Sequence, residues 1–366
     1  MKERSGMTRM RGEKRVTLQD IALETGYSVN TVSRALRGKS DISPATIEHI
    51  RRVADRMGYS VNQIASSLRS GRTHIFAVIL GGMTNPFYGI MADTIQNAAR
   101  EKGYSLMIMC SREDPDTECS LVEQAVSRCV DGVLLFPASG SASSVERLKA
   151  ARMPFVLLSR CIEGTEADAV VADEEEGGYL AARHLIEAGH RKLAFISSGD
   201  VVYSLERRLK GFRRACPEAG IPEKDRSVFV FSQNITGHRE SAAWQETLAE
   251  KLVSLKAEGF TGLFFFCDVE AWHALSAMQR TGAVDREDFG IVGFDNLGGF
   301  LSFPIPLCSV DCGFEEMARA GVRLLRDRIH GDDRPPEKKV CPVRMVCRGS
   351  CGKRPEAENA PGEENK

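Results

Sequence analysis

The sequence predicts a small all-α helix-turn-helix domain followed by a larger α/β domain made of two Rossmann-like lobes. Residues 16–61 carry closely spaced helix start and stop signals, whereas short apolar runs alternate with amphipathic segments from His74 onward. The charge is divided in the same way: residues 1–72 hold 14 Lys and Arg against 7 Asp and Glu, and the rest of the chain holds 35 against 43. With 366 residues, the chain is long enough for two or three separately packed domains.

Helix start and stop signals divide residues 16–61 into three short helices. Each predicted helix follows a Ser or Thr that can cap its open amino end, namely Thr17, Ser28 and Ser43. Asp20 lies three residues after Thr17, as in a capping box. Gly26 allows the tight turn of a helix-turn-helix, and Gly58 ends the third helix.

The second predicted helix is apolar on one side and polar on the other. Its apolar side would pack on the first helix and consists of Val32, Ala35 and Leu36. Asn30 and Arg34 are four residues apart and therefore share the opposite side with Val29 and Ser33. Such a helix fits the DNA major groove, where Arg34 would bind a guanine, Asn30 an adenine edge and Val29 a thymine methyl.

Charge and composition agree with a DNA-binding head on an acidic body. From charge alone, a solvated basic face would be an equally good interpretation, and the helix-turn-helix pattern favours DNA. Residues 1–15 are expected to form a basic flexible tail and 352–366 a disordered one. We expect no signal peptide, and the apolar run at 75–80 is too short to span a membrane.

The eleven cysteines, without a secretory signal, indicate reduced thiols in a cytoplasm rather than a disulfide framework. Three of them lie on apolar runs and are expected to be small buried residues: Cys110, Cys267 and Cys308. A second group of three near the carboxyl end consists of Cys341, Cys347 and Cys351. Their C-x5-C-x3-C spacing, with no nearby His, fits zinc pairs poorly, so we predict no metal site.

The body alternates strands with helices. Eight apolar runs are expected to be buried strands: 75–80, 104–109, 130–136, 154–159, 192–197, 227–231, 262–266 and 289–294. Amphipathic helices are expected at 88–101, 116–128, 174–188, 203–216, 237–258 and 313–329. This order predicts two parallel sheets covered on both faces, with a ligand at the strand carboxyl ends between them.

Other classes of protein fit less well. No G-x-G-x-x-G or Walker loop follows the first strand, so we expect no nucleotide cofactor. No catalytic Ser/His/Asp arrangement stands out, and Asp268, Glu270 and His273 lie on an ordinary amphipathic helix, so an enzyme is not expected. A periplasmic sugar-binding transport component would fit the body alone, but it has no place for a DNA-binding head.

Residues 17–68 resemble the LacI/GalR family of bacterial transcription regulators. The patterns T-x-x-D-I-A at 17–22, TVSRAL at 31–36, S-x-x-T at 43–46 and GY at 58–59 occur in the family's order. The resemblance implies a helix-turn-helix headpiece at 16–61, a hinge helix or linker at 62–72 and a periplasmic-binding-protein-like effector and dimerisation domain at 73–351. It further implies a homodimer on a palindromic operator. The tail shows no sustained heptads that would add a tetramer.

The same resemblance implies the DNA contacts. The residues expected at DNA are Thr17, Ser28, Val29, Asn30, Thr31, Ser33, Arg34, Asn62, Ala65 and Leu68. Ala65 would pack two hinge helices against each other, and Leu68 would enter the minor groove and kink it. The hinge is too short to be a stable helix alone, so we expect it to form on DNA.

The resemblance also implies an effector site between the lobes. Its expected contacts are Asn85, Phe87, Tyr88, Ser159, Arg160, Ser204, Arg208, Asp268 and Asp295. Each has a structural alternative. The N-P-F-Y turn at 85–88 could start a helix with an aromatic plug, Arg160 could form a salt bridge at the edge, Arg208 could be a solvent-facing charge, and Asp295 could cap its loop.

The effector domain departs from the family pattern at one strand end of the first lobe and at two positions of the second. Ser159 stands where relatives usually carry Asp, Cys267 where Asn precedes Asp268, and Cys312 where Gln is frequent. These changes predict an unusual, carbohydrate-like small-molecule effector with an anionic group held by Arg160 and Arg208. By resemblance, the first lobe would run over 74–172 with the helix at 313–330, and the second over 173–303 with the carboxyl-terminal strand. Family precedent favours a repressor that the effector releases from DNA.

Overall fold

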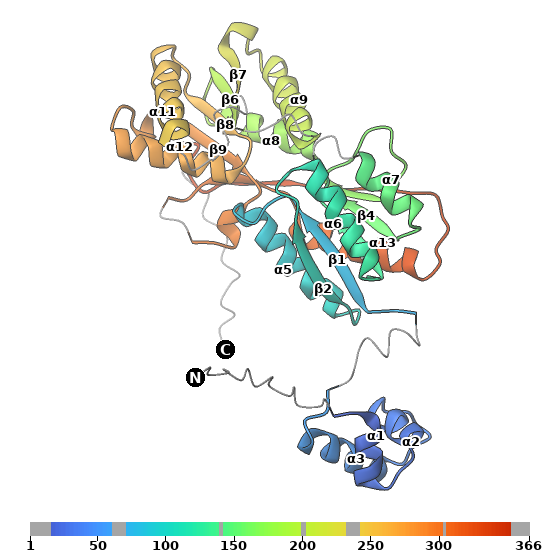
Figure 1. Cartoon of the computed structure of the whole chain (residues 1–366). Helices are drawn as coiled ribbons and strands as arrows, with labels where there is room; N and C mark the ends of the chain where they lie inside the picture. The colour runs from blue at the N-terminus through green and yellow to red at the C-terminus, as the bar shows by residue number, and fades with distance from the viewer. Residues whose placement is uncertain are drawn as a thin grey trace, which may run out of the picture. The chain divides into compact units, whose positions relative to one another are not determined.

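The computed structural model describes residues 16–60, 71–138, 142–198, 203–231, 242–302 and 305–352. The chain divides into two compact units, Met1–Thr73 and His74–Lys366 (Figure 1). Predictions for the hinge residues Asn62, Ala65 and Leu68 lie outside the described residues, as do those for the tails at 1–15 and 353–366. They stay predictions.

The first unit contains three helices, α1 (Leu18–Thr25), α2 (Val29–Leu36) and α3 (Pro44–Arg56). The three predicted caps are present, because the hydroxyls of Thr17, Ser28 and Ser43 each accept a backbone N–H of the following helix. Gly26 and Gly58 adopt φ of 72° and 69°, the left-handed conformation that glycine tolerates best. The three helices share a small core that includes Ile21, Val32 and Ile50.

The second unit contains two six-stranded sheets. The first has the order β11-β5-β4-β3-β1-β2, with β1 (Ile75–Leu80), β2 (Ser105–Cys110), β3 (Gly132–Leu135), β4 (Phe155–Leu158), β5 (Ala169–Ala172) and β11 (Lys338–Cys341). The second has the order β12-β10-β9-β8-β6-β7, with β6 (Leu193–Ser197), β7 (Arg226–Val230), β8 (Gly262–Phe265), β9 (Gly290–Phe294), β10 (Cys308–Asp311) and β12 (Arg344–Val346). Neighbouring strands are parallel except for β10 and β12.

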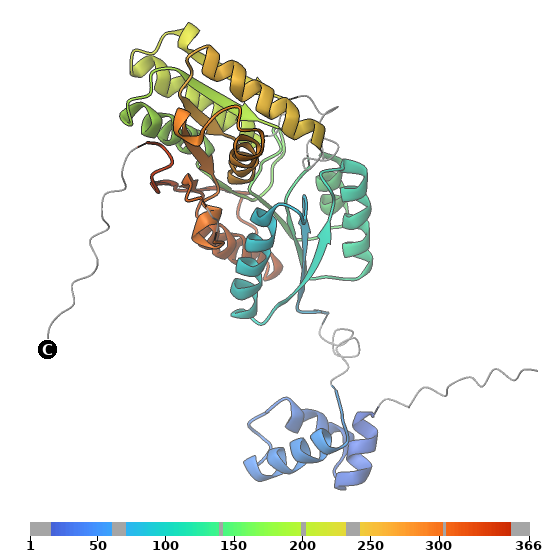
Figure 2. The same ribbon diagram turned by 90° about the vertical axis from the view of Figure 1, so that its left-hand side faces the viewer.

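Helices cover both faces of each sheet, as expected (Figures 1 and 2). The helices are α5 (Pro86–Arg100), α6 (Pro115–Ser127), α7 (Ala142–Ala150), α8 (Glu174–Glu187), α9 (Tyr203–Glu218), α11 (Ala242–Ala257), α12 (Asp268–Thr281) and α13 (Phe314–Ile329). Short 3-10 turns occur at Glu223–Asp225, Arg286–Asp288 and Leu297–Gly299. Alternate residues of β1 separate the two layers, because Phe76 packs with α5 and α13, whereas Ala77 packs with α6 and α7.

Each of the eight predicted strands is present, and four strands were missed. The missed strands β5, β10, β11 and β12 are short and do not lie within a longer apolar run, whereas the equally short β3, β4 and β8 do. The carboxyl-terminal strand that the resemblance implied for the second lobe is β12, Arg344–Val346. Helix α7 was also missed.

The chain crosses between the sheets three times, after β5, after β10 and after β11. Helix α13 packs on β3, β4 and β5, as the resemblance implied for the first lobe. The boundaries differ from that expectation in two respects. Strand β10 extends the second lobe beyond residue 303, and β11 returns to the first sheet before β12 ends in the second.

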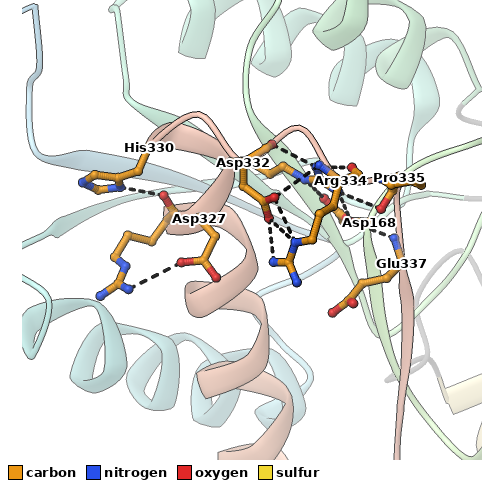
Figure 3. A network of polar contacts seen from close by, with 9 residues as sticks. Asp168, Asp327, His330, Asp332, Arg334, Pro335 and Glu337 are labelled. Atoms are coloured by element: carbon orange, nitrogen blue, oxygen red, sulfur yellow. Dashed lines mark hydrogen bonds and ion pairs between the residues drawn. The ribbon is translucent and has the colours of Figure 1, made fainter.

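A partly buried ion pair holds the return of the chain from α13 to β11 (Figure 3). Arg328 Nε and Nη2 donate to the two carboxylate oxygens of Asp168 at 2.6 and 3.0 Å. Asp168 also accepts the backbone N–H of Glu337 at 2.9 Å, and Arg328 donates to the carbonyls of Asp332 and Arg334. These bonds fix the 330–337 loop next to β5, and so place β11 at the edge of the first sheet.

Candidate DNA-recognition helix and effector cleft

The polar side of α2 is exposed, as the sequence predicts. Val29 is 44% exposed although it is apolar, and Asn30 and Arg34 are exposed beside it. Val32 and Ala35 on the opposite side are completely buried. The helix therefore presents two hydrogen-bonding side chains and one apolar contact from a fixed backbone.

Local contacts already engage part of this surface. Arg34 forms an ion pair with Asp41, and its hydrogen bond lowers the pKa of that carboxyl. Ser33 accepts a hydrogen bond from Arg37 at 2.8 Å, and the hydroxyls of Ser28 and Thr31 bond each other at 2.8 Å. Thr17 is likewise bonded within its capping box. Arg34 would have to exchange Asp41 for a base in order to read DNA.

In the first lobe, the predicted residues Arg160 and Tyr88 meet Glu113, which was not predicted, near the carboxyl ends of the strands. Arg160 Nη1 and Nη2 donate to Glu113 Oε2 and Oε1 at 2.5 and 3.1 Å, and Tyr88 donates to Glu113 Oε1 at 2.5 Å. Arg160 also donates to the carbonyl of Pro137 at 3.1 Å. Ser159 adopts a φ of 65°, a strained turn between the end of β4 and Arg160.

The surroundings of Arg160 stabilise its charge. Burial by itself would lower the pKa of Arg160, but its interactions with neighbouring groups, chiefly Tyr88 and Glu113, raise it overall. Glu174, at the start of α8 in the second lobe, contributes to the same rise. The first-lobe arginine is therefore within electrostatic reach of a carboxylate on the other lobe.

The N-P-F-Y turn forms the start of α5. Asn85 caps the helix, with its side-chain oxygen accepting the N–H of Phe87 at 3.0 Å. Phe87 and Tyr88 are 8% and 7% exposed and pack edge-on against Phe136, while Phe87 also contacts Phe314. This arrangement is the helix start with an aromatic plug that was the structural alternative. Contact of these residues with a ligand stays a prediction.

In the second lobe, Arg208 is the centre of a buried polar network. Its Nε donates to Glu174 Oε2 at 2.6 Å, its Nη1 donates to the carbonyl of Phe266 at 2.5 Å, and its Nη2 lies 3.7 Å from Asp295 Oδ1. The guanidinium also lies 3.5 Å from the ring centre of Phe294. Arg208 is 5% exposed, so the alternative of a solvent-facing charge is wrong.

Two further predicted carboxylates border this network. Asp295 follows β9 with a φ of 100°, and burial together with nearby carboxylates raises its pKa well above the usual value despite Arg208. Asp268 is completely buried and accepts the N–H of Leu297 at 2.8 Å. Burial raises the pKa of Asp268 to about 7. Ser204 is also buried, at the start of α9.

Sequence reasoning missed Glu113 and Glu174, the carboxylates that pair with the two arginines. Glu113 lies three residues after β2, so the same strand-end rule could have found it. Glu174 follows β5, one of the strands that was not predicted. The segments 139–141, 199–202 and 232–241, which follow β3, β6 and β7, lie outside the described residues.

Comparison with known proteins identifies both units. Residues 17–62 match the family described as "Bacterial regulatory proteins, lacI family", and 73–251 match "Periplasmic binding proteins and sugar binding domain of LacI family". Residues 182–351 match a periplasmic binding protein-like domain. Among the part of the chain that the structure describes, no helix is long and apolar enough to cross a membrane.

Individual relatives extend over nearly the whole chain. The transcriptional regulator DegA of Bacillus subtilis is 30% identical over 92% of this chain and 98% of its own length. The structure of the transcriptional regulator CelR with cellobiose is 26% identical, with a TM-score of 0.64 over 92% of this chain and all of that one. The operator-bound lac repressor dimer shares the fold, with a TM-score of 0.76 at 20% identity over 92% of this chain and 99% of that chain.

Proposed function

Because the chain belongs to the LacI family of bacterial regulatory proteins, we propose that it is a repressor that binds a palindromic operator as a homodimer and is switched by a small molecule. The proposal rests on α2, which presents Asn30 and Arg34 to solvent from a capped and packed three-helix unit. One such helix reads one half-site, so two subunits related by a twofold axis require an inverted repeat.

In the proposed complex, Arg34 leaves Asp41 and donates two hydrogen bonds to a guanine. Asn30 pairs with an adenine edge, and Val29 contacts a thymine methyl. Thr17, Ser28, Thr31 and Ser33 position the helix at the phosphates. The hinge residues Asn62, Ala65 and Leu68 enter the minor groove, by family resemblance.

The effector proposed here is a neutral, hydroxyl-rich molecule of the carbohydrate type. Arg160 and Arg208 already have the carboxylates Glu113 and Glu174 as partners, and Asp295 adds another acceptor. A phosphate or carboxylate would have to displace these groups, whereas sugar hydroxyls can donate to the carboxylates and accept from the arginines. The charges therefore favour a neutral ligand over the anionic one that the sequence suggested. The structure of CelR, which is similar to 92% of this chain, is a complex with cellobiose.

The DNA part of the proposal is tested by selection from a randomised duplex library with the purified full chain. We expect an inverted repeat, bound by two chains per duplex. Enrichment of a direct repeat or of a single half-site bound by one chain would refute the palindrome and the dimer.

The effector part is tested by thermal shift with matched pairs of sugars and their phosphate esters. A ligand that binds only the folded state raises the melting temperature, by mass action. We expect a neutral sugar to raise it and to weaken operator binding, and its phosphate ester to have less effect. If only the phosphate esters act, the neutral-ligand proposal is wrong.

A further inference from the structure

Three cysteines and one histidine from distant parts of the chain meet in the second lobe. His184 belongs to α8, Cys308 is the first residue of β10, and Cys347 and Cys351 follow β12. Their side-chain ligand atoms all lie within 4.8 Å of one another. Cys341, which the sequence grouped with the last two cysteines, lies in β11 of the other sheet and does not belong to this cluster.

The separations match a shared metal ion better than a disulfide. The Sγ of Cys347 lies 3.8 Å from the Sγ of Cys308 and 3.8 Å from the Sγ of Cys351. Two thiolates that bind one Zn²⁺ tetrahedrally, each at about 2.3 Å, lie about 3.8 Å apart. A disulfide would need about 2.05 Å.

The histidine supplies an independent indication of a ligand. Its Nε2 atom is shielded from solvent and makes no hydrogen bond of normal geometry among the described residues, and the ring interacts with the Cys308 sulfur. Buried polar atoms normally have a partner, and an orphaned one needs an explanation such as a bound ion. A metal ion among the three sulfurs would accept the lone pair of this nitrogen.

The backbone around the cluster is also fixed. The N–H of Arg348 donates to Cys308 Sγ at 3.2 Å, as backbone amides do toward a thiolate ligand. The N–H of Cys308 donates to Ser350 Oγ at 2.7 Å, and Ser350 Oγ donates to the carbonyl of Ile291 at 2.6 Å. His190 contacts the carbonyl of Cys351 at 3.2 Å. These bonds hold both the strand and the carboxyl-terminal segment in place.

We propose that His184, Cys308, Cys347 and Cys351 bind one Zn²⁺ ion as a structural site. Four protein ligands fill a tetrahedral zinc and leave no position for a substrate, which is the usual form of a structural site. Binding replaces three thiol protons by the metal, so three protons are released. The ion would join α8, β10 and the segment after β12, which are far apart along the sequence. This differs from the expectation of no metal, which weighed only the local cysteine spacing.

The proposal is tested by measuring metal in the purified full chain after growth with added zinc and purification under reducing conditions. We expect one zinc ion per chain by mass spectrometry. Replacement by Co²⁺ should give thiolate-to-cobalt charge-transfer bands and the visible bands of tetrahedral cobalt. An organomercurial reagent should release the zinc and lower the melting temperature.

Variants locate the ion. C308S and C347S should weaken zinc binding by at least about 10-fold, because loss of a direct ligand exceeds the loss of an outer partner. C341S, which changes a buried cysteine of the other lobe, is the matched control and should keep its zinc. H184C should retain zinc in a four-cysteine site, which separates ligand loss from misfolding.

Three results would overturn the proposal. The first is a wild-type protein without stoichiometric zinc that also lacks the cobalt bands. The second is zinc retained equally by C347S and C341S, which would place it elsewhere. The third is a disulfide between any two of the three cysteines under the same reducing conditions. The spectrum of the cobalt-loaded wild-type protein tests the proposed site even if the serine variants fail to fold.

Discussion

Removal of the Arg208 guanidinium should strongly destabilise the second lobe. In the R208M variant, a neutral side chain of similar length would stand beside Glu174 and Asp295, whose side chains are 3% and 5% exposed. Breaking a buried ion pair by removing one partner costs about 3–5 kcal/mol, because the remaining charge stays buried without compensation. Asp295 adds little to this cost because its pKa is already raised, so it can stay protonated and uncharged. The expected loss of unfolding free energy therefore comes mainly from the unpaired Glu174 and is about 3 kcal/mol.

A double-mutant cycle with E174Q identifies the source of that loss. If the cost comes from an uncompensated carboxylate, the R208M/E174Q variant should be more stable than the sum of the single changes predicts. A coupling of about 1–3 kcal/mol is expected for groups in direct contact. Both tryptophans of the chain lie in this lobe, at positions 244 and 272 on α11 and α12, so urea unfolding followed by tryptophan fluorescence reports on it.

Two outcomes would refute this reasoning. A loss below about 1 kcal/mol for R208M would mean that the pair is exposed to water in solution, where such pairs contribute little. Additive effects in the double variant would mean that Glu174 and Arg208 do not act together. Because Glu174 and Arg208 both belong to the proposed effector site, E174Q and R208M should each weaken the effector response.

Three other changes have definite expected outcomes. R34A should weaken binding to the selected operator by about 1–3 kcal/mol and spare random duplex, as anisotropy titrations would measure; equal losses would make Arg34 a phosphate contact. The Asp268 carboxyl keeps its proton up to about pH 7 in the folded protein but loses it near pH 4 in the unfolded chain. Its contribution to the free energy of unfolding therefore falls as pH rises between these values. Urea unfolding of D268N should lack this fall, and a pH profile equal to that of the wild type would contradict the raised pKa. D168N removes the carboxylate that accepts two hydrogen bonds from Arg328. It should lower the free energy of unfolding by about 3 kcal/mol, as thermal unfolding followed by circular dichroism would measure. A loss within experimental error would show that the 330–337 loop is held by its other bonds.

The strands that sequence analysis found and missed differ in the apolar run that surrounds them. IFAVIL and GIVGF are apolar throughout because both faces of a parallel sheet are covered, and such runs are visible in the sequence. Strand β11 reads KKVC and lies at a sheet edge, so only part of it is buried. Its place depends on the Asp168–Arg328 pair, whose members are 160 residues apart. No local pattern contains that information.

The site could be predicted from the sequence to the extent that it lies at strand ends. Arg160 lies two residues after β4 and Asp295 directly follows β9, and both were found by that rule together with the family resemblance. Their charged partners come from other elements. The sequence alone therefore did not show that the arginines are paired with carboxylates, the feature that favours a neutral effector. The zinc cluster was missed for the same reason, because His184 and Cys308 come together only when α8 packs under β10.

Glu174 links the two halves of the proposed effector site. It begins α8 immediately after the first chain crossing, bonds Arg208 of the second lobe and lies within electrostatic reach of Arg160 of the first. A ligand that bonded both arginines would compete for this carboxylate and change the forces on the crossing itself. A ligand can shift a conformational equilibrium only by its difference in affinity for the two states, typically 1–3 kcal/mol of coupling. Exchange of one or two charge-assisted hydrogen bonds at Glu174 is of that size, so rearrangement at this single carboxylate is sufficient in energy to drive the switch.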